Sequence, residues 1–305
     1  MVRLLTRRIV HVLIVVLGVY TALFLLLRLT GDPALLYVSE DAGPAQIQRV
    51  REQLGLADPL PVQYLRFLGR AAVGDFGVSL RYNQPALPLV LAAVPATLEL
   101  TAAALLLSAV VGVPVGILSA TRRNSMADRL SLVASLVGQC VPTFWLGIIL
   151  ILVLALGLGV LPPSGRGTLA HVVMPALTLG AYSTARVARL TRSSVLEVLN
   201  QDFVRTAHAK GLAQRVVILR HVLKNAALPI VTILGLSVST LLGGAVITET
   251  IFDWPGIGRL MVQAVFVRDY PIVQGTAFLI AAMVTAVTFV TDALYAWLDP
   301  RITHA

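Results

Sequence analysis

The polar residues that interrupt the apolar stretches of this chain are its first candidates for chemistry, because hydrocarbon penalises polar groups. Glu99 lies near the start of one apolar stretch, Gln139 in the middle of another, and Asp292 deep in the last. Glu99 and Asp292 are each expected to serve either a polar pathway or a contact between helices. Ser237 adds a hydroxyl, and hydroxyls more commonly support helix packing. These four residues are the candidate pathway residues.

The residue types that usually carry catalysis do not form a recognisable site here. The single Cys140 lies within an apolar stretch, where a thiol more often behaves as a small hydrophobic group. The five histidines form neither an HExxH pair nor a Cys/His ligand spacing, and no GxxxxGK[ST] motif is present. We therefore predict a chain with no catalytic residue, no metal site and no cofactor of its own. Any ATP hydrolysis linked to it must come from another chain.

The composition is that of a polytopic membrane protein. The chain has 305 residues, of which 57% are hydrophobic and 13% charged, and its mean hydropathy is +0.85. A helix needs about 20 mostly apolar residues to cross a bilayer. We predict one all-α domain over residues 1–305 with six transmembrane helices, at 9–29, 95–120, 130–157, 171–191, 226–248 and 272–298. Pro114 and Pro142 should kink the second and third spans.

Two features of these spans need a choice between alternatives. Arg186 and Arg189 weaken the fourth span unless its last turns reach the membrane interface, where long basic side chains can extend into water. Arg7 and Arg8 before the first span would also suit a signal peptide. The apolar run is longer than a typical signal sequence and no A-x-A site follows it, so we interpret it as a retained span.

The distribution of basic residues sets the predicted orientation. Arginines cluster before the first span, near Arg122 and Arg123, and throughout residues 192–225. Cytoplasmic loops carry such an excess, which places both termini and the 192–225 loop in the cytoplasm. The net charge of +9 is thus mainly a topology signal. Basic and aromatic residues do not interleave, so the sequence gives no support for nucleic-acid binding.

The outer segment, residues 30–94, is the longer of two regions outside the spans. Ala45–Leu54 and Pro61–Ala71 are predicted to be helices, with turns near Gly74–Gly77 and Asn83–Pro85. The segment could be a solvated cap or a landing surface for an extracytoplasmic protein. The candidate docking residues are Arg49, Arg51 and Arg66.

The cytoplasmic loop 192–225 is predicted to hold two helices. Asp202 suits an N-cap, Phe203–Lys210 a two-turn helix, and Gly211 the left-handed position after it. Gln214–Lys224 would return the chain to the membrane before Pro229. The first helix could dock in a groove of a partner or lie on anionic lipid. We predict docking, with Ala207 facing the groove, and take as its candidate residues Asp202, Arg205, Thr206, Ala207, Lys210 and Gly211.

Short motifs in a fixed order run nearly from end to end. They include Gly31-Asp-Pro33, Pro95-Ala-Thr-Leu-Glu-Leu100, Pro142-Thr-Phe-Trp-Leu-Gly147, Leu161-Pro-Pro-Ser-Gly165, Asp202–Gly211, Glu249–Arg259, Asp269-Tyr-Pro271 and Leu298-Asp-Pro-Arg301. Together they resemble the permease subunits of ATP-binding-cassette importers of the dipeptide/oligopeptide/nickel type, specifically the first of the two paired permeases. The 192–225 loop resembles the coupling loop of that superfamily, whose general form begins Glu-Ala-Ala. Here Arg205-Thr-Ala207 stands at that place and Gly211 is retained, so no ion pair from the missing glutamate is expected.

The resemblance implies an assembly. The chain would form half of a pathway in the bacterial inner membrane, embedded in lipid and paired with a homologous permease. Two ATPase subunits would bind ATP and Mg²⁺ inside the cell, and a substrate-binding protein would deliver the cargo outside. Peptides are the first choice of substrate, with nickel, glutathione or another small solute as alternatives. A secondary transporter is a distant alternative, because no internal repeat is visible, and an intramembrane hydrolase lacks a catalytic constellation.

Overall fold

The computed structural model describes residue 14 and residues 17–26, 34–35, 38, 43–53 and 56–298, with side chains for all of these except 53 and 292–298. Within this part the chain is helical, and an isolated antiparallel bridge between Val78 and Pro85 is its one β-type pairing. The predicted all-α class is confirmed. The chain divides into two compact units: Met1–Val94 with Leu260–Thr285, and Pro95–Arg259 with Ala286–Ala305.

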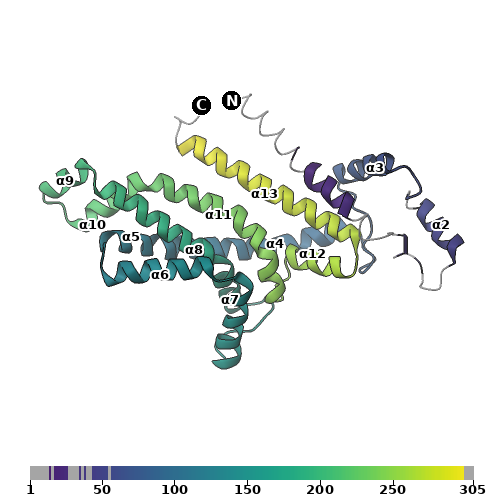
Figure 1. Ribbon diagram of the computed structural model, residues 1–305, viewed down its shortest axis with the longest axis horizontal. Helices are drawn as coiled ribbons and strands as arrows, with labels where there is room; N and C mark the ends of the chain where they lie inside the picture. Colours follow the sequence, from purple (N-terminus) through teal and green to yellow (C-terminus); the bar gives the residue numbers. More distant parts are fainter. Residues whose placement is uncertain are drawn as a thin grey trace. The chain divides into compact units, whose positions relative to one another are not determined.

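The first unit contains most of the outer segment. Its helices are Leu17–Leu26, α2 (Pro44–Gln53) and α3 (Leu60–Ala72), followed by the first turns of α4 and part of α13 (Figure 1). Helices α2 and α3 confirm the two predicted for this segment. Gly74, Gly77 and Asn83 have positive φ values of 76°, 90° and 54°, which form the predicted turns.

Aromatic rings and one buried carboxylate hold the first unit together. The Tyr20 ring lies 5.0 Å from that of Phe67 and 5.6 Å from that of Phe278, measured between centroids. Asp269 accepts hydrogen bonds from the Ser79 hydroxyl at 2.5 Å and the Arg81 backbone N–H at 3.2 Å. These contacts fasten the outer segment to the start of α13 within this unit.

The second unit is a bundle of helices packed around α8 (Leu169–Leu199). Its other complete elements, in chain order, are a π-helical segment (Ser108–Gly112), α5 (Val113–Thr121), α6 (Met126–Cys140), α7 (Thr143–Leu150), a π-helical segment (Ile151–Gly157), α9 (Asp202–Ala209), α10 (Gln214–Val216), a π-helical segment (Val217–Val222) and α11 (Leu223–Ile251). Three helices are shared between the two units: α4 (Ala86–Leu107), α12 (Ile257–Phe266) and α13 (Tyr270–Leu298). Figure 1 shows α5, α6 and α11 running alongside α8.

Glycine permits the close approach of α5 and α8. A Cβ on Gly116 would lie 2.5 Å from the backbone oxygen of Ala188, and one on Gly112 would lie 2.9 Å from that of Thr184. Small residues at an interface let helix backbones meet, which is a common means of packing in membranes. These contacts leave no space for a side chain at Gly116 of α5 or at Gly112 just before it, so this part of the chain packs tightly on α8.

The two prolines act differently on their helices. Pro142 separates α6 from α7, and the two helices meet at 105°. Val141 is extended, with ψ of 124°, because the ring of a proline disfavours helical geometry in the residue before it. The predicted kink in the third span is confirmed (Figure 1). Pro114 lies in a helix that continues from Ala86 to Thr121, where a π-helical segment precedes it in place of a sharp kink.

The described helices do not confirm the predicted count of six membrane crossings: three, or four with the bent pair, are long and apolar enough to cross. Ala86–Thr121, Gln214–Ile251 and Tyr270–Thr291 are long and apolar enough to cross, and the bent pair Met126–Gly157 makes a fourth candidate. The predicted first span lies partly outside the described residues. Helix α8 has the length, but its apolar character is reduced by Arg186, Arg189 and other charged residues.

Candidate functional site

Helix α9 connects α8 to the continuous helix that contains α10 and α11. It begins after Gln201, whose φ and ψ of −80° and 151° are those of a cap residue. The prediction that Asp202 is the N-cap is therefore wrong: Asp202 is the first helical residue. Its carboxylate lies 3.6 Å from the Arg205 guanidinium and is almost fully exposed. Its negative charge in the first turn still interacts favourably with the positive end of the helix dipole.

The end of α9 matches its prediction. Gly211 has φ of +76°, a left-handed conformation that glycine adopts without the steric cost paid by other residues. The Gly211 N–H donates to the carbonyl of His208 at 2.9 Å, and the Leu212 N–H donates to that of Ala207 at 3.3 Å. These bonds close the last turn and direct the chain toward α10.

The inner face of α9 is buried against the chain's own helices. Val204 and Ala207 are three residues apart, so they share one face of the helix, and they are 3% and 7% exposed. We call the hydrophobic cluster that they join the α9 cluster. It consists of Ala120, Val195, Val198, Val204, Ala207, Val217, Val222, Ala226 and Ile230. The prediction that Ala207 faces a partner is wrong, since its side chain is buried in this cluster, and α9 packs on the π-helical segment Val217–Val222 of the same chain.

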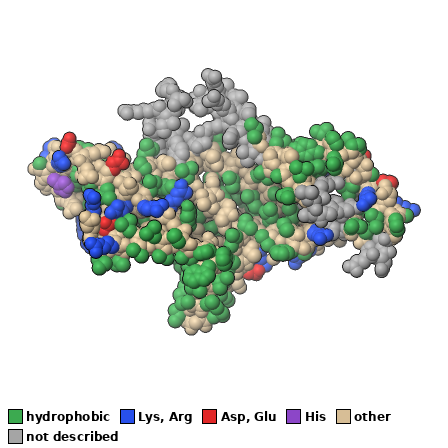
Figure 2. Space-filling model, in the orientation of Figure 1, with side chains coloured by type: hydrophobic (Ala, Val, Ile, Leu, Met, Phe, Trp, Pro, Cys, Tyr) green, Lys and Arg blue, Asp and Glu red, His purple; other side chains and the backbone are tan. Residues whose placement is uncertain are grey.

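The outer face of α9 is exposed and polar, and it carries two basic side chains and the acidic Asp202. Phe203, Arg205, Thr206, His208 and Lys210 all face solvent. Figure 2 shows basic side chains and a histidine gathered at the end of the second unit that carries α9 and α10. The α9 helix therefore has one face packed on its own chain and one face exposed.

The segment after α9 forms a longer helix than predicted. The predicted helix Gln214–Lys224 does not end before Asn225, because Gln214–Ile251 is continuous and includes Pro229. The second turn of this helix is π-helical, at Val217–Val222. Four residues of the α9 cluster therefore belong to one continuous helix that is long enough to cross a membrane: Val217, Val222, Ala226 and Ile230.

A buried carboxylate lies beside the α9 cluster and joins three helices. Asp128, in the first turn of α6, accepts from Arg192 Nε of α8 at 2.7 Å and from its terminal nitrogen at 2.9 Å. The Ser119 hydroxyl of α5 donates to the same carboxylate at 2.5 Å, and the Asn124 N–H donates at 2.9 Å. The Asp128 side chain is only 3% exposed. We call this arrangement the Asp128 clasp.

The candidate pathway residues lie in different settings. Glu99 accepts two hydrogen bonds from Arg166, at 2.8 and 2.5 Å, and both side chains are partly exposed. Gln139 accepts from Arg189 at 2.8 Å beside the Pro142 bend. Ser237 is buried and donates to the carbonyl of Ile233 in its own helix at 2.7 Å. The side chain of Asp292 lies outside the described residues. No common polar site unites the first three.

The candidate docking residues of the outer segment are on its surface. Arg49 and Arg51 are exposed on α2. Arg66, on α3, lies 2.8 Å from the Asp58 carboxylate, and both of these side chains are partly exposed. None of the three is needed to fill the core of the first unit, so their roles remain predictions.

A second buried carboxylate, Glu249, was not predicted as a site residue. It is fully buried, and it accepts from the Thr97 hydroxyl at 2.6 Å and from the Gly258 and Arg259 N–H groups at 2.8 and 3.1 Å. Trp254 closes the same turn by donating to the carbonyl of Ala96 at 2.8 Å. We call this the Glu249 clasp. The motif Glu249–Arg259 was its only sequence signal.

The Asp128 clasp was also missed, although a local signal existed. Ser125 is the N-cap of α6, and its side chain accepts from the Asp128 N–H at 3.3 Å, as expected for a polar cap followed three residues later by an acidic one. Arg192 had been counted only as a topology residue. Among the described residues, no group of three or more His, Cys, Asp or Glu side chains could hold a metal ion.

Comparison with known proteins places these features in a family. Residues 112–304 match the family described as "Binding-protein-dependent transport system inner membrane component", and residues 1–101 match the N-terminal part of the same kind of component. The chain belongs to this family. It is thus a multi-pass membrane permease of the binding-protein-dependent transport type.

Curated relatives of this permease match over nearly the whole chain. The dipeptide transport system permease protein of Alkalihalophilus pseudofirmus is 38% identical over 98% of each chain. The oligopeptide transport system permease protein of Bacillus subtilis is also 38% identical, again over 98% of each. The glutathione transport system permease protein of Escherichia coli is 40% identical over 90% of each.

Solved structures support the fold of the permease. One inward-facing structure of the methionine ABC transporter aligns with a TM-score of 0.58 and 19% identity, covering 69% of this chain and 96% of that one. An amino acid ABC transporter aligns with a TM-score of 0.51 over 68% and 93% of the two chains. The ABC importer permease fold is therefore shared at low sequence identity.

Proposed function

We propose that this permease forms half of the translocation pathway of an ATP-driven peptide importer in the bacterial inner membrane. It pairs with a homologous permease, and two ATPase subunits bind ATP and Mg²⁺ on the cytoplasmic side. A binding protein outside the membrane delivers the peptide. The chain itself contributes no catalytic residue, and ATP hydrolysis is supplied by the ATPase subunits.

The observation that carries this proposal is the combination of end-to-end likeness to peptide permeases with the geometry of α9. The relatives named for dipeptide and oligopeptide transport align over 98% of their length. Helix α9 has a buried inner face and an exposed polar outer face. A short helix held in this way suits docking in a groove of an ATPase, with Arg205, Thr206 and Lys210 toward the partner.

The lipid-surface alternative for α9 fits the structure less well. An interfacial helix buries its apolar face in the headgroup region, but the apolar residues Val204 and Ala207 are already buried in the α9 cluster. What remains exposed is mostly polar and basic, apart from Phe203 at 37% exposure. This face favours a protein partner of complementary charge and shape.

Glutathione is the second candidate substrate. The glutathione permease of Escherichia coli is 40% identical to this chain over 90% of both, and glutathione is itself a small peptide. The two candidates share the free carboxylate and amine of a peptide backbone. They differ in the γ-linkage and the thiol of glutathione, and the binding protein would recognise these groups.

The test begins with the complex captured through an affinity tag on this chain in its native membrane. Subunits that co-purify are identified, and the complex is reconstituted in proteoliposomes with its binding protein. The binding protein is first screened for thermal stabilisation by dipeptides, oligopeptides, glutathione and Ni²⁺. We expect stabilisation by peptides and ATP-dependent uptake of the same peptides. Uptake driven by an ion gradient without ATPase subunits would contradict the proposal.

A further inference from the structure

Helix α6 packs on α8, but the α9 cluster does not reach it. The cluster draws its members from α5, α8, α9, the π-helical segment Val217–Val222 and α11, and none of its described members belongs to α6. Displacement of α9 therefore acts first on the π-helical segment Val217–Val222 and, through the α9 cluster, on α5, α8 and α11. It reaches α6 only through whatever joins α6 to those helices at the same end.

The Asp128 clasp is the connection at that end. The carboxylate of Asp128 receives two nitrogens of Arg192 from α8 and the hydroxyl of Ser119 from α5. The two arginine bonds are parallel and leave from one rigid planar group, so they fix orientation as well as distance. The Arg192 side chain is 21% exposed and that of Asp128 3%. Water therefore competes little for the carboxylate.

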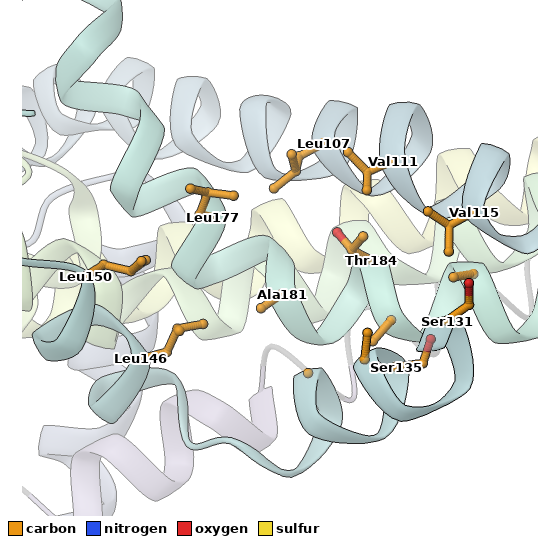
Figure 3. Close-up of a pocket in the computed structure, with 14 residues that line it drawn as sticks. Leu107, Val111, Val115, Ser131, Ser135, Leu146, Leu150, Leu177, Ala181 and Thr184 are labelled. Atoms are coloured by element: carbon orange, nitrogen blue, oxygen red, sulfur yellow. The ribbon is translucent and has the colours of Figure 1, made fainter. Parts of the chain in front are cut away.

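The rest of α6 packs against α8 but makes fewer polar contacts than the clasp. At its far end Gln139 accepts one hydrogen bond from Arg189 at 2.8 Å, and Gly138 lies close to Ala185. Between its two ends lies an apolar groove of about 360 Å³. Figure 3 shows Ser131 and Ser135 of α6 across the groove from Leu107, Val111 and Val115. The middle of α6 therefore borders an open apolar groove on the side that faces the end of α4.

We propose that Asp128 and Arg192 are positioning residues that transmit the displacement of α9 to α6 and, through it, to the bend at Pro142. The inference rests on the proposed function, in which ATPase closure moves α9. The clasp makes the α6 end follow α8 and α5 as one body. The groove under the middle of α6 leaves the helix free to pivot, so the 105° bend with α7 takes up the motion.

The chain contains a natural reporter for this motion. Cys140 is its only cysteine, is the last residue of α6 and is exposed beside the bend. A nitroxide label is attached to Cys140 in the full complex, with the other subunits in cysteine-free form. Its spectrum is recorded without nucleotide and with ATP trapped on the ATPases. In parallel, the ATP hydrolysed per peptide imported is measured in proteoliposomes.

We expect the wild-type label to change its spectrum on ATP trapping. Asp128→Asn should abolish that change and raise the ATP consumed per peptide about tenfold, as expected for a loss of coupling between sites. Asp75→Asn is the matched control, because Asp75 forms an exposed pair with Arg70 at 2.9 Å in the other unit. The control should behave as wild type in both measurements.

If Asp128 and Arg192 only stabilise the fold, the spectral change and the ATP consumed per peptide will differ from these expectations. Wild-type spectral change and stoichiometry in Asp128→Asn would overturn the inference. If that variant does not assemble, Arg192→Lys decides, because lysine keeps the charge and loses the planar bidentate contact. A reduced spectral change in assembled Arg192→Lys supports the inference, and a full one overturns it. Failure of the wild type to import peptide with ATP would instead refute the proposed function.

Discussion

The two buried carboxylates of the second unit are stabilised in opposite ways. Asp128 meets a cation, since both of its oxygens accept from Arg192. Glu249 meets no cationic side chain among the described residues and accepts only from a hydroxyl and two backbone N–H groups. The guanidinium of Arg259 is directed instead to Asp253. One carboxylate is held by side chains and the other mainly by backbone.

This difference determines how each clasp can be changed. An ion pair can be replaced as a pair, because both partners are side chains, and apolar replacement of a buried pair is often neutral. The donors to Glu249 belong to the N-terminus of α12, where helix N–H groups favour an anion. Among substitutions at Gly258 and Arg259, only proline removes a backbone N–H donor. The Asp128 clasp is therefore adjustable, and the Glu249 clasp is fixed by the backbone.

The largest effect is expected where the Glu249 clasp depends on glycine. A Cβ on Gly258 would lie 2.5 Å from the Cα of Val246, and backbone there cannot move aside without opening the turn. Gly258→Ala should lower the free energy of unfolding by about 3 kcal/mol or more, from overpacking together with lost hydrogen bonds. The measurement is the thermal midpoint of the purified complex.

The control for that substitution is Gly243→Ala, because no atom lies within 4 Å of a Cβ built there. It should leave the midpoint unchanged or raise it slightly, since alanine is the better helix former. Equal midpoints in the two variants would show that the Glu249 turn is not tightly closed.

The next largest effect on stability is expected at the Asp128 clasp. A double substitution can test this clasp as a pair, which is not possible for the Glu249 clasp. Asp128→Leu alone leaves the Arg192 charge half-buried without its partner, a loss of about 2–4 kcal/mol. Adding Arg192→Met removes that charge and should recover at least half of the lost stability. A double-mutant cycle of thermal midpoints measures this recovery of stability. A double variant no more stable than Asp128→Leu would mean that the ion pair is not the main interaction at this site.

A smaller effect on stability, with a large effect on transport, is expected at Gly211. A β-branched side chain at φ of +76° costs about 1–2 kcal/mol. No atom lies within 4 Å of a Cβ at this position, so the cost is conformational. Gly211→Val should insert and assemble but lose peptide uptake. Gly211→Asn, which tolerates this conformation better, should retain more uptake than the valine variant.

The smallest effect is expected at Asp75 in the first unit. Hydrogen bonds from the Arg70 guanidinium and the Gly77 N–H hold the pKa of Asp75 below its usual range. A lowered carboxylate pKa stabilises the fold above the unfolded pKa, and the contribution is lost as pH falls through the folded value. Because both side chains are about half exposed, Asp75→Asn should cost about 0.5 kcal/mol or less at neutral pH. Urea unfolding monitored at neutral and acid pH checks this difference.

The local elements could be predicted from sequence, and the long-range contacts could not. Helices α2, α3 and α9, the bend at Pro142 and the positive φ of Gly211 all follow from residues close in sequence. The two clasps join residues 64 and 152 positions apart, so no local pattern contains both partners. The span count also depended on hydropathy alone, which cannot say how a bent or charged helix sits in a membrane.

The face of α9 on which Ala207 lies could have been predicted from a local sequence pattern. The prediction that Ala207 faces a partner rests on its small side chain, which would let α9 fit closely in a groove. Its spacing of three residues from Val204 places both on one face, and an apolar pair on a short polar helix is more simply explained by burial in its own chain. That spacing, rather than side-chain size, was the informative feature.

The central claim is that α9 is fixed to this permease by its inner face and meets the ATPase by its outer face. Ala207→Trp and His208→Trp place the same side chain at a buried and at an exposed position of α9. ATPase retention is measured together with the ATP hydrolysed per peptide in proteoliposomes. The account predicts that Ala207→Trp keeps the ATPases but hydrolyses ATP with little import, whereas His208→Trp releases them. Release of the ATPases by Ala207→Trp with normal retention in His208→Trp would contradict it.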